Sequence, residues 1–347
     1  MLTPSPFLLA DPSACLRRLV LLDLMGKGLA DREVQELEET MADDGLVRGL
    51  IQRQNSDGSW DSADLGSAWG RGNRILATSA ALYRLGYAGF GASFGAVQKG
   101  ADYLYGCQQP DGGWPLSLDR SEEEGKGGTG YTLVPLQTAL PLRGLAVCGY
   151  ASDARSERAY DWLLEQRLED GAWPTGIAAG VHGFVGGYRR LAHSQWGCRS
   201  NTTAALGCLS LHPQRKDSSA ARRAFDLLLG RESQEENSLG FEVARTVGAE
   251  ALRGFFTFFA HFDLGQVLDF AWRLGASGED PRLKAMIQFV TNLRGPRGLW
   301  TYPNHPQAAR WVSFDLTRSL LRLSGDGWEG SEPRTPFRAY PRQIRRF

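Results

Sequence analysis

One short stretch recurs along this chain and constrains its fold more than any other feature. Cys107–Trp114 follows an apolar run with a helical pattern, and its Gln-Pro pair ends that run, because a residue before proline is pushed out of the α region. The Asp-Gly-Gly that follows favours a tight turn with positive φ, and Trp114 closes the corner. The sequence therefore predicts a helix, a chain reversal and a buried indole at this point.

Four other stretches follow the same pattern. Gln54–Trp60 and Gln166–Trp173 are clear copies, Asn292–Trp300 is a diverged copy, and Ser238–Phe241 ends in Phe in place of Trp. The closing aromatic residues are 54 to 68 residues apart, a period typical of one repeated supersecondary unit. The 347 residues are therefore expected to form one domain of stacked repeats instead of two ordinary domains.

The helical segments between these turns alternate in character. Helices rich in small and apolar residues follow each turn, and amphipathic helices precede the next one, as expected for an inner and an outer layer. We predict an all-α fold, an (α/α)6 toroid spanning residues 13–325, with an N-terminal arm at 1–12 and a basic, proline-rich C-terminal tail at 326–347. The expected helices span 14–25, 31–53, 71–85, 97–108, 131–147, 156–166, 201–211, 218–229, 258–274, 281–293 and 309–323.

The composition excludes several classes of function. The formal net charge is zero, so nothing indicates nucleic acid or an anionic surface as a partner. The five cysteines show no CxxC pairing and are expected to be reduced, buried thiols. No apolar run reaches the ~18 residues of a membrane span, and the N-terminus lacks the pattern of a signal peptide. We expect a cytoplasmic protein without a transmembrane segment, and peripheral membrane contact stays open.

The repeated motif, Q…DGxW after an outer helix, resembles the QW repeat of the squalene-hopene cyclase and protein prenyltransferase superfamily over about residues 40–325. The resemblance implies a central cavity for a lipophilic, isoprenoid-like substrate. In the cyclase branch, a DxDD-T-A motif opens an inner helix, and its middle acid protonates an alkene or epoxide. The matching stretch here, Trp196–Leu206, keeps Thr203-Ala204. Its acids are replaced by Arg199, Ser200, Asn201 and Thr202.

Two near-copies, Phe262–Gly265 and Phe314–Thr317, stand at the expected starts of successive late inner helices. Asp315 precedes Thr317 by two residues, the offset of the middle acid in DxDD-T. We interpret Asp263 as a proton donor assisted by His261 and Asp315, because an apolar wall keeps a carboxyl protonated and aromatic faces stabilise cations. The residues expected to bind the substrate are Phe258, Phe259, Phe262, Phe314, Trp196, Tyr131, Trp311 and Arg199.

Each aspartate also has a structural interpretation, as a helix cap or as the partner of a nearby arginine. The prenyltransferase branch offers a zinc site built from His261, Asp263 and Asp315, although its Asp-x-Cys ligand pair is absent here. The leading interpretation needs no metal and no cofactor.

We predict an atypical terpenoid-cyclase-like enzyme that performs acid-initiated cyclisation or isomerisation of an isoprenoid or polyene-bearing substrate in an aromatic-lined cavity. The second hypothesis is a non-catalytic toroid that binds an isoprenoid or docks a helical protein partner, and the third is a prenyltransferase-like enzyme. An open pocket with an acid and aromatic rings favours the enzyme. Salt bridges that occupy Asp263 and Asp315 favour the binding toroid.

Overall fold

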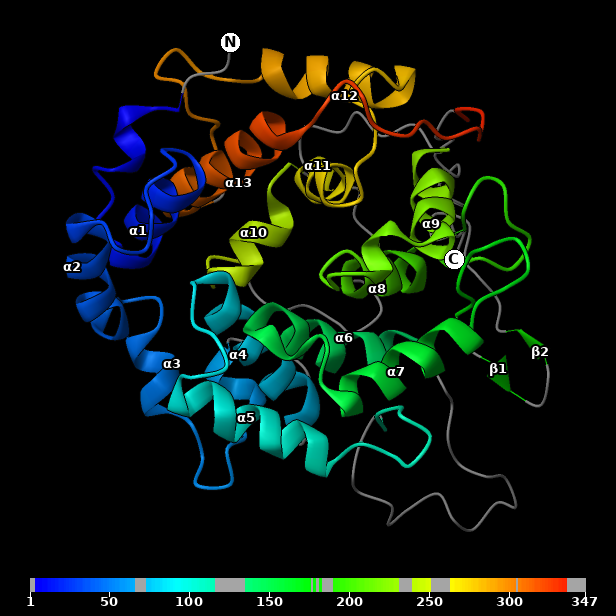
Figure 1. The fold of residues 1–347 in the computed structure, drawn as a ribbon, viewed down its shortest axis with the longest axis horizontal. Helices are drawn as coiled ribbons and strands as arrows, with labels where there is room; N and C mark the ends of the chain where they lie inside the picture. Colours follow the sequence, from blue (N-terminus) through cyan, green and yellow to red (C-terminus); the bar gives the residue numbers. More distant parts are fainter. Residues whose placement is uncertain are drawn as a thin grey trace, which may run out of the picture.

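The computed structural model describes residues 4–65, 73–115, 135–175, 177–178, 181–182, 190–230, 239–250, 263–303 and 305–335. Two concentric layers of helices form a ring (Figure 1). The inner helices are α1 (Ala14–Asp23), α4 (Arg74–Tyr87), α6 (Pro135–Leu145), α8 (Arg199–Leu209), α11 (Leu264–Arg273) and α13 (Ala309–Arg322). The outer helices are α2 (Arg32–Thr40), α3 (Arg48–Gln52), α5 (Gly95–Gly106), α7 (Ala154–Glu165), α9 (Ser219–Leu229) and α12 (Pro281–Asn292). The predicted α/α toroid is confirmed.

Short elements complete the described part of the chain. A further helix, α10 (Phe241–Thr246), contacts both α4 and α13 inside the ring (Figure 1). Strands β1 (Ile177–Ala178) and β2 (Val181–His182) pair antiparallel. Ala146–Tyr150 forms a π turn after α6. The 3₁₀ turns are Pro6–Leu8, Met41–Asp43, Ser62–Leu65, Arg215–Asp217 and Pro306–Ala308. None of the described helices has the length and apolarity that a membrane crossing requires.

The four turns that end in tryptophan have the same hydrogen bonds. Each indole Nε1 donates to the carbonyl ten residues earlier, on the preceding outer helix, at 2.6 or 2.7 Å. Each tryptophan backbone N–H donates to a hydroxyl of the next inner helix at 2.8 to 3.1 Å. The tryptophans are Trp60, Trp114, Trp173 and Trp300, and the hydroxyls belong to Thr78, Thr138, Thr202 and Ser313. The indole therefore fastens each outer helix to the inner helix that follows.

Burial separates the two layers as the pattern predicts. Every residue of α8 is buried, from Arg199 to Leu209, as expected for a helix enclosed on all sides. The outer helix α2 buries only Val34 and Leu37 and presents its charged residues to solvent. The inner ring therefore forms the core and surrounds the lumen.

The predicted helix 31–53 is wrong in its middle. It is interrupted at Asp44, whose φ of −57° and ψ of 134° leave the helical region. The Asp44 carboxylate accepts a hydrogen bond of 2.6 Å from the Ser13 hydroxyl and one of 3.1 Å from the Cys15 N–H, at the start of α1. The hydrogen bonds of Asp44 to the start of α1 therefore interrupt the helix that the local sequence pattern predicts.

Candidate functional site

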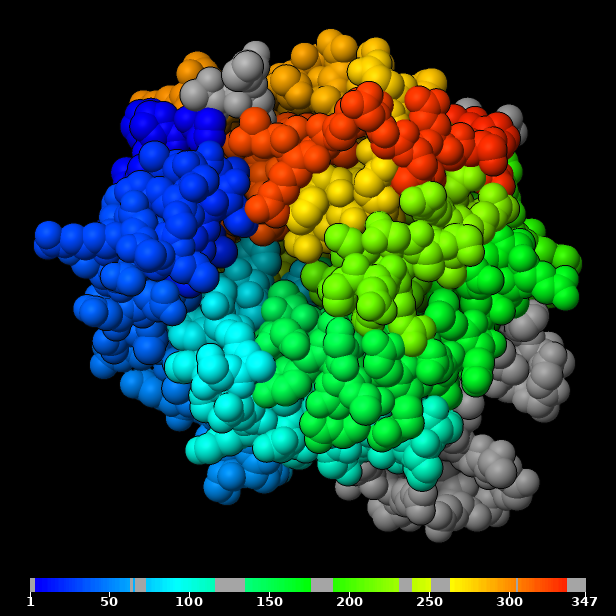
Figure 2. All heavy atoms as spheres, in the orientation of Figure 1, coloured from blue at the N-terminus to red at the C-terminus, as the bar shows by residue number. Residues whose placement is uncertain are grey.

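Among the described residues, two cavities in the lumen share part of their lining. The larger, of about 290 Å³, lies among the C-terminal parts of the inner helices and is called here the large cavity. The small cavity, of about 40 Å³, lies between α4, α6 and α10. Figure 2 shows a hollow where inner helices from both ends of the sequence meet. Both cavities are lined by Tyr83, Arg143, Glu242 and Thr246.

The large cavity is more polar than the predicted aromatic-lined one. Among the residues that the structure describes, Tyr83, Tyr87 and Phe270 are its aromatic lining, while eight charged side chains share the wall. The predicted phenylalanines 258, 259 and 262 lie outside the described residues. The described lining therefore combines rings that can face a cation with carboxyl groups that can transfer a proton.

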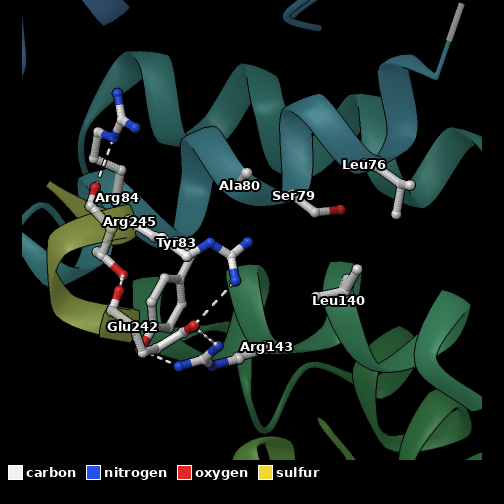
Figure 3. Close-up of a pocket in the computed structure, with 10 residues that line it drawn as sticks. Leu76, Ser79, Ala80, Tyr83, Arg84, Leu140, Arg143, Glu242 and Arg245 are labelled. Carbon is white, nitrogen blue, oxygen red and sulfur yellow. Dashed lines mark hydrogen bonds and ion pairs between the residues drawn. The ribbon is translucent and has the colours of Figure 1, made fainter. Parts of the chain in front are cut away.

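A buried polar network lies in the wall that the two cavities share, and Figure 3 shows it beside the small cavity. Arg143 Nη1 donates to Glu242 Oε1 at 2.7 Å, and its Nη2 donates to the Tyr83 hydroxyl at 2.5 Å. Arg245 Nη1 lies 3.5 Å from Glu242 Oε2. Burial raises the pKa of Tyr83 to about 12, so this hydroxyl stays protonated at neutral pH. Burial opposes the charge of Arg143, but Tyr83 and Glu242 raise its pKa above the usual value.

Three aspartates and three arginines form a second network in the wall of the large cavity. Arg318 is its centre: it pairs with Asp315, one helical turn earlier on α13, and its nitrogens lie 3.5 Å from oxygens of Asp269 and Asp23. Asp269 also pairs with Arg273 at 2.8 Å, and Asp23 pairs with Arg322 at 2.8 Å. We call these six residues the aspartate–arginine cluster.

Two aspartates of this cluster have pKa values shifted in opposite directions. Burial raises the pKa of Asp315 to about 6, against the lowering effect of Arg318, and the charge of Asp269 adds to the rise. Burial also acts on Asp269, but Arg273 and Arg318 outweigh it and hold its pKa below the usual value. Two carboxyls whose pKa values are pushed apart can act as a proton donor and a proton acceptor. Of the two carboxyls, Asp315 has the higher pKa.

The cavities lie near the C-terminal ends of inner helices, and this position explains why arginines line them. Four inner helices have an arginine in the last turn: Arg84, Arg143, Arg273 and Arg322. A cation is stabilised there, because the helix dipole is negative at the C-terminus. The repetition of an arginine near the ends of four of the six inner helices is visible in the sequence, and this signal could have located the site.

Asp263 occupies a cap and not the cavity wall. It is the N-cap of α11, and its carboxylate accepts backbone N–H bonds from Gly265 at 2.9 Å, Gly240 at 3.0 Å and Glu242 at 2.6 Å. Burial raises its pKa to about 7, although these three donors favour the anion. Asp263 lines neither cavity. This geometry agrees with the structural interpretation of Asp263 as a helix cap. A proton-donor role for Asp263 stays a prediction.

The position of Asp315 along α13 differs from the one inferred from the near-copies Phe262–Gly265 and Phe314–Thr317. Asp315 lies well inside α13, which begins at Ala309, and not at a helix start. The hydroxyl that binds a tryptophan N–H on α13 belongs to Ser313 and not to Thr317. Asp315 therefore follows the repeat hydroxyl by two residues, whereas the offset analogy placed it two residues before. The change brings Asp315 to the large cavity.

Of the other predicted site residues, those that the structure describes line neither cavity. Phe314 and Trp311 are buried in the core of α13, Arg199 is buried at the start of α8, and Trp196 is 41% exposed. His261 and Tyr131 lie outside the described residues. Of the predicted residues that are described, only Asp315 lines the large cavity.

A zinc site from His261, Asp263 and Asp315 also stays a prediction. The two aspartates occupy different surroundings, one capping α11 and the other paired with Arg318. Within the described ranges, no group of three or more His, Cys, Asp or Glu side chains is arranged to hold a metal ion. His261 falls outside those ranges.

Comparison with known proteins gives a consistent set of matches. Residues 11–191, just over half of the chain, match the family model of the squalene-hopene cyclase C-terminal domain. Squalene–hopene cyclase of Zymomonas mobilis subsp. mobilis is 29% identical over 147 residues, 42% of this chain and 21% of that protein. Lanosterol synthase of Candida albicans is 33% identical over 125 residues, 36% of this chain and 16% of that protein. The matches thus span about a fifth of the length of these relatives.

Solved structures also align with the chain. A variant of the type II terpene cyclase MstE from Scytonema, in complex with geranylgeranyl dihydroxybenzoate, aligns over 89% of this chain and 87% of that chain, at 14% identity and a TM-score of 0.45. A protein from Actinoplanes aligns over 80% of this chain and 97% of that chain, at 14% identity and a TM-score of 0.35.

Proposed function

Because this chain belongs to the squalene-hopene cyclase C-terminal domain family, we propose that it is a terpenoid-cyclase-like enzyme that protonates a polyene in the lumen of its toroid. The substrate is an isoprenoid or another polyene-bearing molecule, and the reaction is cyclisation or isomerisation. One observation supports this most: a buried carboxyl, Asp315, lines a cavity of about 290 Å³ at the centre of the ring.

Asp315 is the proposed proton donor. Burial raises its pKa to about 6, well above the usual value of a carboxyl, so a fraction of Asp315 is neutral near neutral pH and the neutral form predominates below about pH 6. Arg318 and the Tyr87 hydroxyl, which donates to Asp315 Oδ1 at 3.4 Å, stabilise the carboxylate that remains after proton transfer. An acid whose neutral form is accessible near neutral pH, and whose anion is stabilised after proton transfer, is suited to protonate a weak base such as an alkene.

The proposed step is balanced in protons and electrons. The O–H bond of Asp315 breaks, a C–H bond forms at one alkene carbon, and a carbocation forms at the other carbon. The π electrons of a second alkene then attack the cation and close a ring. Loss of a proton from a neighbouring carbon to the anionic Asp269 ends the reaction, with no oxidant or reductant.

The cavity wall supports a transient cation. Tyr83 and Tyr87 present neighbouring rings from α4, with centroids 6.5 Å apart, and Phe270 lies on the same wall. Ring faces attract cations by about 0.5–2 kcal/mol each. The inner-helix C-termini around the cavity add negative dipole ends. Both features act on a positive charge formed beside Asp315.

Turnover by an Asp315→Asn variant tests the proposal. The purified protein and the variant are incubated with squalene, farnesol and farnesoic acid, and products are separated by gas chromatography and mass spectrometry. We expect the variant to lose about 100-fold or more in rate, the usual contribution of a general acid, and to bind the same ligands. Asp43→Asn, which makes the same chemical change at an exposed outer position, serves as the matched control.

Equal turnover by the Asp315→Asn variant and its parent would show that another group starts the reaction. Loss in Asp263→Asn alone, with both variants folded, would move the proton donor to the cap of α11. Circular dichroism and thermal unfolding of each variant separate lost chemistry from lost structure.

One observation favours a second candidate function, a toroid that binds an isoprenoid without turnover. Asp315 is paired with Arg318, and a salt bridge that occupies this aspartate is expected of a binding toroid. The same experiment separates the two: a ligand that co-purifies or binds and is recovered unchanged under all conditions supports binding alone.

A further inference from the structure

A groove of about 450 Å³ lies at the C-terminal ends of α6, α8 and α11, and we call it the outer groove. It shares four lining residues with the large cavity: Ala146, Ser210, Leu211 and Arg273. The outer groove and the large cavity therefore adjoin, and one elongated molecule can lie in both.

The volume of the large cavity limits the length of the chain that it can hold. A cavity of about 150 Å³ holds one benzene molecule, with six carbon atoms. At the same density, the large cavity of about 290 Å³ holds roughly 12 carbon atoms. A chain of three isoprene units is longer than this, so it extends beyond the large cavity, and the adjoining outer groove has room for its other end.

Among the residues that the structure describes, the charged side chains on the outer groove are both cations, Lys216 and Arg273. His212 also lines the groove, but its Nδ1 accepts two backbone N–H groups at 3.1 and 3.0 Å, and its Nε2 lies 2.8 Å from Glu157 Oε1. The proton of the imidazole is therefore on Nε2, and the ring is neutral. The chemistry of this lining suits a ligand with a negative charge.

Arg273 has unused donors where the outer groove meets the large cavity. Its Nε donates to Asp269 Oδ2 at 2.8 Å, and its guanidinium carbon lies 4.5 Å from the centroid of the Trp272 ring. Within the described part of the chain, its two terminal nitrogens have no hydrogen-bond partner, and the side chain is 22% exposed. The contacts with Asp269 and Trp272 fix the guanidinium plane and leave the Nη1–Nη2 edge for a ligand with two oxygen atoms.

Lys216 supplies the net positive charge of the outer groove. Its backbone N–H donates to the His212 carbonyl at 3.4 Å, which holds this residue beside the groove wall. No described residue forms a hydrogen bond or an ion pair with its Nζ. Because Asp269 balances the charge of Arg273, Lys216 provides the attraction for an anion and Arg273 provides the directed donors.

We propose that the outer groove binds the oxyanion head group of a linear isoprenoid, a carboxylate or a phosphate, with Arg273 and Lys216 as its partners. The inference rests on the proposed function, because the hydrocarbon chain of this substrate would occupy the large cavity beside Asp315. Asp269 joins the two sites, since it holds Arg273 and also lies 3.5 Å from Arg318, the partner of Asp315. The negative dipole ends of α8 and α11 oppose an anion here, so the head group needs both cations.

Saturated analogues test the site without turnover, because they have no alkene to protonate. Hexahydrofarnesol, hexahydrofarnesoic acid and hexahydrofarnesyl phosphate have the same chain and differ only at the head group. At about pH 8 the acid and the phosphate are ionised and the alcohol is neutral. In isothermal titration calorimetry, we expect at least one of the two anions to bind about tenfold more tightly than the alcohol, the equivalent of one charge-assisted hydrogen bond. The anion that binds more tightly identifies the head group.

A charge reversal at Lys216 should remove the preference for the anion. Lys216→Glu changes a partly exposed side chain that holds no other described group, so we expect the fold to tolerate it. Lys99→Glu makes the same change at an exposed position of α5, outside the groove, and should keep the preference. The two variants have the same net charge, so a general electrostatic effect would change both equally.

A conservative change at Arg273 tests the directed donors. Arg273→Lys keeps a cation beside Asp269 but removes the planar pair of terminal nitrogens, so we expect about threefold or more weaker binding of the anion and unchanged binding of the alcohol. A purely structural role for Arg273 predicts that both ligands bind more weakly by the same factor. Unfolding curves of each variant identify loss of structure.

Equal affinity of the unchanged protein for the alcohol and both anions would overturn the site, and this comparison needs no variant. A preference for the anion that persists in Lys216→Glu would place the head group elsewhere and would also overturn it. Turnover of squalene or farnesol that depends on Asp315, without preference for an anion, would leave the proposed function intact and remove this inference alone. A preference that Lys216→Glu abolishes, in a protein with no turnover, would support the head-group site and remove the proposed function.

Discussion

Glu242 and Arg143 are 99 residues apart in the sequence, yet Glu242 Oε1 accepts a hydrogen bond of 2.7 Å from Arg143 Nη1 in the lumen. Their side chains are only 10% and 8% exposed. The pair joins α10 to α6 across the ring, between the two cavities. Because each charge is buried, each depends on the other for compensation.

Arg143→Ala should therefore lower the free energy of unfolding strongly. We expect a loss of about 3–5 kcal/mol, the usual effect of removing one partner of a buried pair. Arg32→Ala breaks an exposed pair with Glu36 on α2 and should change stability by at most about 0.5 kcal/mol. Urea denaturation of both variants measures the difference, and similar losses in the two would contradict it.

Thr202→Val tests the bond that fastens α8 to the preceding turn. The Thr202 hydroxyl accepts the Trp173 N–H at 3.0 Å, and both residues are fully buried. Valine has the same shape but no acceptor, so the N–H loses its partner at a cost of about 1–3 kcal/mol. Thr202→Ser keeps the hydroxyl and should be the more stable variant in denaturation curves. The reverse order would show that packing of the methyl group dominates.

Gly112→Ala tests the tight turn before Trp114. Gly112 has a φ of +99°, and an added Cβ would lie 2.5 Å from the Arg158 carbonyl oxygen. We expect a loss of stability of more than about 1 kcal/mol, because the left-handed conformation and the contact both disfavour a side chain. Gly106→Ala, at the end of α5 with open space around it, should be neutral or stabilising. Thermal unfolding of the pair gives the comparison.

Asp263→Asn tests the raised pKa of the α11 cap. A carboxyl whose pKa is higher in the folded state contributes stability at low pH and loses that contribution as pH rises through the folded value. Since the pKa of Asp263 is raised to about 7, this contribution should decline between about pH 4 and pH 7. The variant does not ionise there, so its deficit relative to the parent should shrink over this interval. A constant deficit in urea denaturation at several pH values would contradict the shift.

The rate of the proposed reaction should also depend on pH. Asp315 donates a proton only when it is neutral, and its pKa is raised to about 6. The rate should therefore increase as pH falls through about 6 and level off below it. A rate profile measured on the folded protein checks this. A rate that increases with pH instead would indicate a catalytic base.

Much of the fold was predictable from local sequence. The Gln, Asp-Gly and Trp spacing at Cys107–Trp114 and its copies identifies the turns, because a turn residue and a helix-ending proline act on their immediate neighbours. The alternation of apolar and amphipathic helices identifies the inner and outer layers for the same reason, since burial on all sides requires apolar residues on all sides. The sequence did not predict α10, a helix of six residues without a periodic pattern.

The candidate site was only partly predictable. The sequence identified Asp263 and Asp315 as unusual acids, but it gave them equivalent positions. The tertiary structure separates them: Asp263 is fixed by backbone N–H groups of Gly240 and Glu242, while Asp315 faces the large cavity beside Arg318.

The sequence by itself determined the repeats, the layers and the family, because these depend on residues that are close together in the chain. Only the tertiary structure decided which charges meet. Arg143 pairs with Glu242 from α10, and Tyr87 contacts Asp315 over 228 residues of sequence. Closure of the ring brings such residues together, and burial then fixes their pKa values and pairings, which no local pattern encodes.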